Sequence, residues 1–340
     1  MEIDEKNVRI SYDQMKSEFT RILIKLGFSE LKADKCAEIF TLNSLEGIYS
    51  HGVNRFTRFV ESIKDGYIKI DSIPSLVQRT GSFEQWSGNL GPGPLNASFA
   101  TTRAMELAQE NGIGLVAMAN TNHWMRGGTY GWQAARKGFV LICWTNTLPN
   151  LPAWGATDPR LGNNPMVIAI PYKNEAIVLD SAMSQFSYGK LETFRNEGKQ
   201  LPMAGGFNKQ GELTTDPGEI LETWRPLPAG YWKGAGMALL LDIMATIFSG
   251  GLSTHEISRS KVEFNVSQVF IAIRITSLNN FPAIDNSIQK IIDDLHNSAP
   301  ENKTTKIRYP GENVIVIRDT NLKNGIPVDR KIWEKIMSIK

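Results

Sequence analysis

The chain has 340 residues, 41% hydrophobic and 21% charged, a composition typical of a globular protein with a large core. The formal net charge of +2 and the lack of any lysine–arginine run argue against nucleic acid as a partner. The two cysteines, Cys36 and Cys143, lie in apolar stretches and match no zinc-site spacing. We therefore expect buried free thiols, no metal centre and a reducing compartment.

The N-terminal segment and the most apolar run give the expected location. Met1–Lys6 is acidic, where a signal peptide would be basic and then apolar. The longest apolar run, Met237–Phe248, spans 12 residues, contains Asp242 and is too short to cross a bilayer. We expect a cytoplasmic protein with no membrane partner.

The first part of the chain predicts helices. Ser11 followed by Gln14 is typical of a capped helix start, and apolar residues then repeat at helical spacing until Gly27. A second helix is expected from Ser29 to about Gly47, and a third one carries apolar residues from Phe56 to Ile63.

From about residue 80 onward, short apolar runs predict strands. These runs are Ile113–Ala117, Val140–Trp144, Met166–Ile170, Ala176–Leu179, Val269–Ile275 and Val314–Ile317. Helices are expected at Asn96–Asn111, Tyr130–Lys137 and Asp329–Ile339, with loops over residues 148–165 and largely irregular chain over 189–236. The pattern predicts a mixed α/β (α+β) fold.

Three regions are expected along the chain. Residues 1–75 are expected to form a helical N-terminal region, residues 76–300 a mixed-sheet domain, which the family resemblance given below implies to be the nicotinamide-cofactor-binding domain, and residues 301–340 a segment that packs back on the N-terminal region.

Two histidine motifs carry the candidate chemistry. In Tyr49–Phe56, His51 and Arg55 are four residues apart and would share one face of a continuous helix. Reduction of a 2-oxo acid needs a proton donor for the carbonyl oxygen, a role that histidine suits, and a cation for the carboxylate, a role that arginine suits. Asn122–Gly128 repeats the pairing with His123 and Arg126. Either motif alone is more often structural; the pair is more informative, because the chain has four histidines.

The glycine-rich segments are the candidates for a nucleotide-binding fingerprint. Gly91–Asn96 lacks the third glycine of G-x-G-x-x-G, contains two prolines and follows no predicted strand, so it is no Rossmann motif. Gly230–Gly236, followed by the apolar run, is either a phosphate-binding loop with Lys233 or a loop that caps a buried helix. Asp180 and Ser181, after a predicted strand, are a second, weak candidate.

Together, four motifs resemble the malate/L-lactate dehydrogenase family that lacks a Rossmann fold. They are Ser50–Phe56, Asn122–Gly128, Gly162–Pro165 and Gly230–Gly234. Within that family the likeness is strongest to a branch that acts on a sugar-derived 2-oxo acid, through Tyr130–Ala135, Cys143–Asn146 and Phe186–Gly189.

The resemblance implies a non-Rossmann fold of the L-sulfolactate dehydrogenase type, a mixed sheet with flanking helices and a helical N-terminal region. It also implies a homodimer and NADH-dependent reduction of a 2-oxo acid, with His51 as proton donor and with Arg55 and His123 in the active site. The cofactor residues that it implies are Ala176, Ile177, Val178, Leu179, Asp180, Ser181, Ala182, Trp232, Lys233, Gly311, Glu312 and Asn313. Because the family often has a basic residue at or near Glu312, NADPH is the alternative cofactor.

Other functions stay open at this point. The same scaffold could reduce or oxidise malate, lactate, ureidoglycolate or a cyclic imino acid. A non-catalytic binding protein with a decayed active site is the rival from another class, and the intact His51, Arg55 and His123 argue against it.

Overall fold

A seven-stranded mixed sheet lies at the centre of the computed structural model, which describes residues 7–260 and 262–339. Neighbouring strands follow the order β2-β3-β4-β12-β5-β8-β9, and β3 and β4 pair in parallel while the other neighbours are antiparallel. The strands are β2 Ser75–Thr80, β3 Phe83–Ser87, β4 Ile113–Thr121, β12 Val266–Arg274, β5 Phe139–Thr145, β8 Met166–Tyr172 and β9 Glu175–Ser181. A Rossmann domain has a largely parallel sheet. The topology therefore explains why the chain carries no Rossmann motif.

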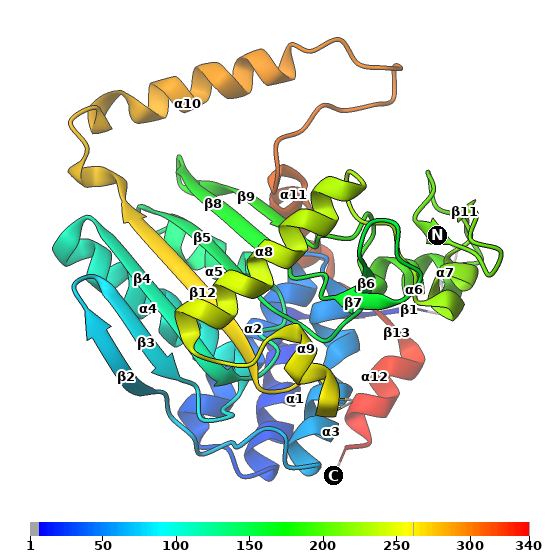
Figure 1. Cartoon of the computed structure of the whole chain (residues 1–340), viewed down its shortest axis with the longest axis horizontal. Helices are drawn as coiled ribbons and strands as arrows, with labels where there is room; N and C mark the ends of the chain where they lie inside the picture. Colours follow the sequence, from blue (N-terminus) through cyan, green and yellow to red (C-terminus); the bar gives the residue numbers. More distant parts are fainter. Residues whose placement is uncertain (1–6, 261, 340) are drawn as a thin grey trace.

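Each face of the sheet is covered by helices, because successive strand residues point to opposite sides. Leu141 and Cys143 of β5 join the core under α4 (Gly93–Asn111) and α5 (Gly127–Ala135). Trp144, one residue on, packs on the other face against α8 (Trp232–Ser249), which crosses the sheet in Figure 1.

The two ends of the chain share a second core. The helices α1 (Tyr12–Lys25), α2 (Glu30–Leu45) and α3 (Val53–Lys64) pack around stacked rings of Phe19 and Phe56, whose centroids are 4.0 Å apart. β1 (Asn7–Ile10) pairs antiparallel with β13 (Ile326–Asp329), and α12 (Arg330–Met337) adds Trp333 and Ile336 to this core. The limits of the three expected regions stay predictions.

Short elements connect these layers. They are η1 Tyr49–His51, β6 Leu151–Pro152, β7 Pro159–Leu161, α6 Tyr188–Asn196, β10 Gly206–Phe207, β11 Leu213–Thr214, α7 Pro217–Thr223, α9 Thr254–Ile257, η2 Ser258–Ser260 and η3 Ile275–Ser277. Two longer helices complete the chain, α10 Phe281–His296 and α11 Glu312–Asn324, and α10 projects away from the sheet in Figure 1.

Most of the expected elements are confirmed, with ends shifted by a few residues. Ser11 caps α1 by accepting a hydrogen bond from the Gln14 backbone N–H at 3.2 Å, and Gly27 ends that turn with φ +95°. Both cysteines are buried and free. The pattern missed β1, β2, β3, β13 and α10, and Ile275 belongs to η3.

Two expectations were wrong. Val314–Ile317 lies inside α11, because the helix begins after Gly311 and packs Val314 and Ile315 on the core of the sheet. β-branched residues lower helix propensity only slightly, so tertiary packing overrides their strand preference. Gly230–Gly236 was expected to be a loop before the apolar run. Instead, the 18-residue helix α8 begins at Trp232, so Gly234 and Gly236 are helical.

Helix α8 is apolar and long enough, by length and composition, to cross a membrane. In this fold one side of it packs on the sheet, and Trp144 donates its Nε1 hydrogen to the Leu241 carbonyl at 3.1 Å. Asp242 Oδ1 accepts hydrogen bonds from Asn146 Nδ2 and from the Thr254 N–H, each at 2.9 Å.

Candidate active site

His51 lies at the break between η1 and α3. Gly52 has to be a glycine, because a Cβ atom there would collide with Ser44 Oγ and approach the Phe40 carbonyl oxygen at 3.0 Å. Ser44 Oγ also accepts a hydrogen bond from the Val53 N–H at 2.8 Å, so α2 caps the start of α3. The break means that His51 and Arg55 do not share one continuous helix, as the spacing alone suggested.

The His51 side chain is only partly exposed and is held from both sides. Its Nδ1 lies 3.0 Å from Ser50 Oγ, and its carbonyl oxygen accepts a hydrogen bond from Asn43 Nδ2 at 2.8 Å. Burial, with the charges of Arg55 and Arg126, lowers the pKa of His51 from 6.5 to about 4. The imidazole is therefore neutral at pH 7, which corrects the assumption of a pKa near neutrality.

His123 faces His51. The two rings are stacked, with centroids 5.7 Å apart and an angle of 22° between their planes. His123 Nδ1 accepts a hydrogen bond from the Met125 N–H at 2.9 Å, so the neutral ring carries its proton on Nε2. That Nε2 lies 3.8 Å from Glu263 Oε1. Burial and the Arg55 charge hold the pKa of His123 well below its usual range.

Arg55 lines a small, partly open cavity whose wall includes the His123 ring. The cavity has a volume of about 50 Å³, and its polar wall includes Arg55, Arg58, Tyr67, Asn122, His123 and Glu263. Among the described residues the Arg55 guanidinium makes no hydrogen bond or ion pair, although burial lowers its pKa. A largely buried guanidinium without a partner is costly, and a bound carboxylate would satisfy it.

Sequence patterns missed three of these side chains. Arg58 follows Arg55 by one helical turn, so the spacing could have suggested it. Ser50 precedes His51 directly and lies inside the motif, but the sequence gives its hydroxyl no separate role. Glu263 follows η2 in a segment without any motif, and tertiary folding alone brings it to His123.

The three expected cofactor segments converge on β9. The Val178 N–H donates to the Pro310 carbonyl oxygen at 3.0 Å, which holds the start of α11 against this strand. Just beyond β9, the Ala229 N–H donates to the Met183 carbonyl oxygen at 2.9 Å, and this bond holds the start of α8 nearby.

The expected cofactor residues differ in how far their side chains are exposed to solvent. Ala176 and Val178 point into the core, so only their backbone can meet a ligand. Leu179 is 44% exposed and Trp232 63% exposed, and Lys233 beside it is also exposed. The remaining segment residues are partly or fully exposed: Ile177, Asp180, Ser181, Ala182, Gly311, Glu312 and Asn313.

A nicotinamide dinucleotide fits this arrangement. The amino terminus of α8 lies near the residues just beyond β9, and helix N-termini bind phosphate through free N–H groups. Gly311 has φ +90° and packs closely on β9. A Cβ atom there would lie only 3.2 Å from the backbone N and O atoms of Val178. At the start of α8, the exposed indole of Trp232 supplies an apolar surface and the ammonium of Lys233 supplies a cation.

A buried chain of ion pairs links this region to the histidines. Arg126 pairs with Glu46, and Glu46 Oε1 lies 3.2 Å from Arg318 Nη1. Arg318 also pairs with Glu175, the first residue of β9. Near the other end of β9, Asp180 Oδ2 accepts a hydrogen bond from the Gly128 N–H at 2.8 Å and lies 4.0 Å from Arg126 Nε.

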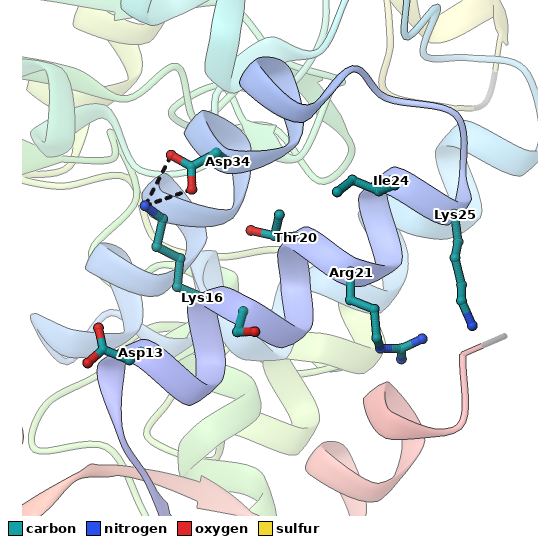
Figure 2. Close-up of a pocket in the computed structure, with 8 residues that line it drawn as sticks. Asp13, Lys16, Thr20, Arg21, Ile24, Lys25 and Asp34 are labelled. Atoms are coloured by element: carbon teal, nitrogen blue, oxygen red, sulfur yellow. Dashed lines mark hydrogen bonds and ion pairs between the residues drawn. The ribbon is translucent and has the colours of Figure 1, made fainter.

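A wider hollow lies elsewhere on the molecule, and most of its charged side chains form ion pairs. It is an open groove of about 620 Å³ over α1 and α2, drawn in Figure 2. Its cation Lys16 is paired with Asp34 at 2.8 Å, and Arg21 with Glu18. No histidine lines it, so we place the candidate active site at the smaller cavity.

Comparison with known proteins defines the class. The family of malate/L-lactate dehydrogenases matches residues 10–337, and the chain belongs to this family. It is an oxidoreductase with the mixed, non-Rossmann fold described above.

One group of relatives is more specific. The chain is 44% identical to 2,3-diketo-L-gulonate reductase of Escherichia coli over 333 residues, which cover 98% of this chain and all of the relative. Among solved structures, malate dehydrogenase from Pyrococcus horikoshii is 29% identical, with a TM-score of 0.90 over 100% of this chain and 96% of that chain. Sulfolactate dehydrogenase from Methanocaldococcus jannaschii is 26% identical, with a TM-score of 0.89 over 98% and 96%.

Proposed function

We propose that this oxidoreductase reduces 2,3-diketo-L-gulonate, a sugar-derived 2-oxo acid, with NADH, as a step in carbohydrate breakdown. The observation that carries the proposal is the unpartnered Arg55 guanidinium beside two facing neutral imidazoles. A 2-oxo acid offers a carboxylate to the guanidinium and a carbonyl oxygen to an imidazole.

His51 is the proton donor in this proposal, and Arg55 binds the substrate carboxylate. Burial is the main cause of the low pKa of His51, and the Arg55 charge lowers it further; a bound carboxylate offsets that charge and so raises the pKa of His51. His123, with its proton on Nε2, donates a hydrogen bond to the substrate oxygens. The nicotinamide supplies the hydride.

The residues that hold the cofactor are those of the three converging segments. Glu312, the first residue of α11, favours NADH over NADPH in this proposal. Its Oε2 accepts hydrogen bonds from the Tyr309 N–H at 3.1 Å and from His296 at 3.2 Å, which fix a negative charge there. A carboxylate binds ribose hydroxyls and repels the additional phosphate of NADPH.

A homodimer in the cytoplasm is the proposed form of the protein. The outer side of α8 exposes a run of apolar side chains that a second copy would cover. They are Met237, Leu239, Leu240, Ile243 and Ile247, the last 65% exposed. Sedimentation of the wild type and of Ile247→Lys tests this: the wild type is expected as a dimer, and a wild-type monomer would contradict it.

Loss of NADH absorbance with a panel of 2-oxo acids tests the activity. The expected order of kcat/KM places 2,3-diketo-L-gulonate above pyruvate, oxaloacetate, oxalurate and a cyclic imino acid. A higher value for one of the others would replace the substrate on the same scaffold. A protein that binds these acids but oxidises no NADH would be the non-catalytic binding protein.

A further inference from the structure

Glu263 is an unexpected charge in the wall of the candidate substrate cavity. Its side chain is 15% exposed, and among the described residues its one polar contact is the 3.8 Å approach to His123 Nε2. A carboxylate held out of water without a hydrogen-bond donor is costly. Glu263 lines the cavity, and its charge partly offsets that of Arg55 without forming an ion pair with it.

The segment that carries Glu263 is held in place. The Phe264 ring packs on Tyr67, a second residue of the cavity wall, with centroids 5.0 Å apart. Asn265 adopts a left-handed φ of +59° just before β12. The contact between Phe264 and Tyr67 therefore fixes the position of Glu263 in the cavity wall, which α3 also lines.

The charges around the cavity set what it can accept. Among the described residues that line the cavity, Arg55 and Arg58 contribute two positive charges and Glu263 one negative charge, and without substrate both neighbouring histidines are neutral. A substrate with one carboxylate neutralises the remaining positive charge. A substrate with two carboxylates would place an excess negative charge next to Glu263.

We propose that Glu263 determines substrate specificity: its carboxylate accepts hydrogen bonds from substrate hydroxyl groups beyond the carbonyl and repels a second substrate carboxylate. This inference rests on the proposed function and adds to it the class of 2-oxo acid that the cavity selects. Hydroxylated monocarboxylates are favoured, and dicarboxylates such as oxaloacetate are disfavoured.

The test compares Glu263→Gln with the wild type on three substrates. We expect kcat/KM to fall about 10- to 100-fold for 2,3-diketo-L-gulonate, because hydrogen bonds to a charged acceptor are lost. For oxaloacetate we expect a rise of at least about tenfold, because like-charge repulsion is removed. Pyruvate, which has neither hydroxyl nor second carboxylate, should change less than about threefold on the same reasoning.

Glu192→Gln is the matched control. The negative charge of Glu192, like that of Glu263, raises the pKa of Arg55. Unlike Glu263, Glu192 is exposed on α6 and does not line the cavity. Its removal should leave the ratio of the three substrates unchanged. If Glu263→Gln folds poorly, Glu263→Asp is used instead. The shorter carboxylate should lower kcat/KM for 2,3-diketo-L-gulonate and keep kcat/KM for oxaloacetate low.

Two failures are distinguishable. A wild type that reduces none of these acids overturns the proposed function, whatever the variant does. A wild type that reduces the sugar acid, with the same substrate ratio in Glu263→Gln, overturns the role of Glu263 alone.

Discussion

Two sets of charged groups lie close together in this molecule and differ in how they are satisfied. In the buried chain of ion pairs, Glu46 contacts both Arg126 and Arg318, and all three are less than a tenth exposed. In the candidate active site, Arg55 and Glu263 face one cavity and make no ion pair with each other.

The difference separates structural from functional charges. A buried ion pair compensates its own desolvation, so removal of one partner leaves the other uncompensated. A charge at a cavity that forms no ion pair contributes mainly to ligand binding, so its substitution mainly weakens that binding. We expect substitutions in the first set to change stability and those in the second to change kinetics.

The largest expected effect is on catalysis by His51. His51→Ala should lower kcat about 10²- to 10⁴-fold, the usual contribution of a positioned proton donor. NADH binding, followed by nicotinamide fluorescence, should persist, because the cofactor segments are elsewhere. His255→Ala, at an exposed position on α9, is the control and should keep full turnover. Full turnover in a folded His51→Ala protein would exclude His51 as proton donor.

The ion-pair chain predicts the opposite behaviour. Glu46→Gln leaves Arg126 and Arg318 buried without their shared carboxylate, so the free energy of unfolding should fall by about 3–5 kcal/mol. Urea denaturation measures this. Glu61→Gln makes the same change in an exposed pair with Lys335, 3.5 Å apart, and should cost less than about 1 kcal/mol. Equal changes in the free energy of unfolding for the two substitutions would show that the buried ion pairs stabilise the fold no more than the exposed pair does.

Local patterns predicted the helices of the N-terminal region and five of the seven strands of the central sheet, because the apolar residues there follow the period of a helix or a strand. They failed at Val314–Ile317, where packing of α11 on the sheet outweighs the strand preference of β-branched residues. They also missed β2, whose six residues are all exposed and so show no alternation.

The candidate site was predictable only in part. His51, Arg55 and His123 stand out because histidine and arginine recur in two motifs, and folding brings them together. Their surroundings are not local in sequence. The low pKa of His51 depends on burial and on Arg126, and Glu263 reaches His123 from 140 residues away in the chain. No single-sequence pattern carries that proximity.

Acid should weaken the folded protein through His51. Its pKa is about 4 in the folded chain and 6.5 when exposed, so between these values the unfolded chain binds a proton that the folded chain does not. Stability is therefore complete above pH 6.5 and falls as the pH drops toward 4, by up to about 3 kcal/mol. His51→Asn should have a shallower slope of unfolding free energy between pH 7 and 5. An unchanged slope would mean that His51 titrates normally in the folded chain.

The smallest expected effect is that of Arg55→Lys, and it tests the comparison most directly. Lysine keeps the positive charge but lacks the planar fork that binds a carboxylate through two hydrogen bonds. KM for the 2-oxo acid should rise about tenfold, within the range that a charged hydrogen bond contributes. The unfolding free energy should hardly change, because Arg55 makes no hydrogen bond or ion pair among the described residues. Arg103→Lys is the matched control, because Arg103 binds Glu84 through Nε and Nη2, both at 2.8 Å, and does not line the cavity. There the same substitution should lower stability and leave KM unchanged. An Arg55→Lys protein that loses stability but keeps its KM would place Arg55 among the structural charges instead.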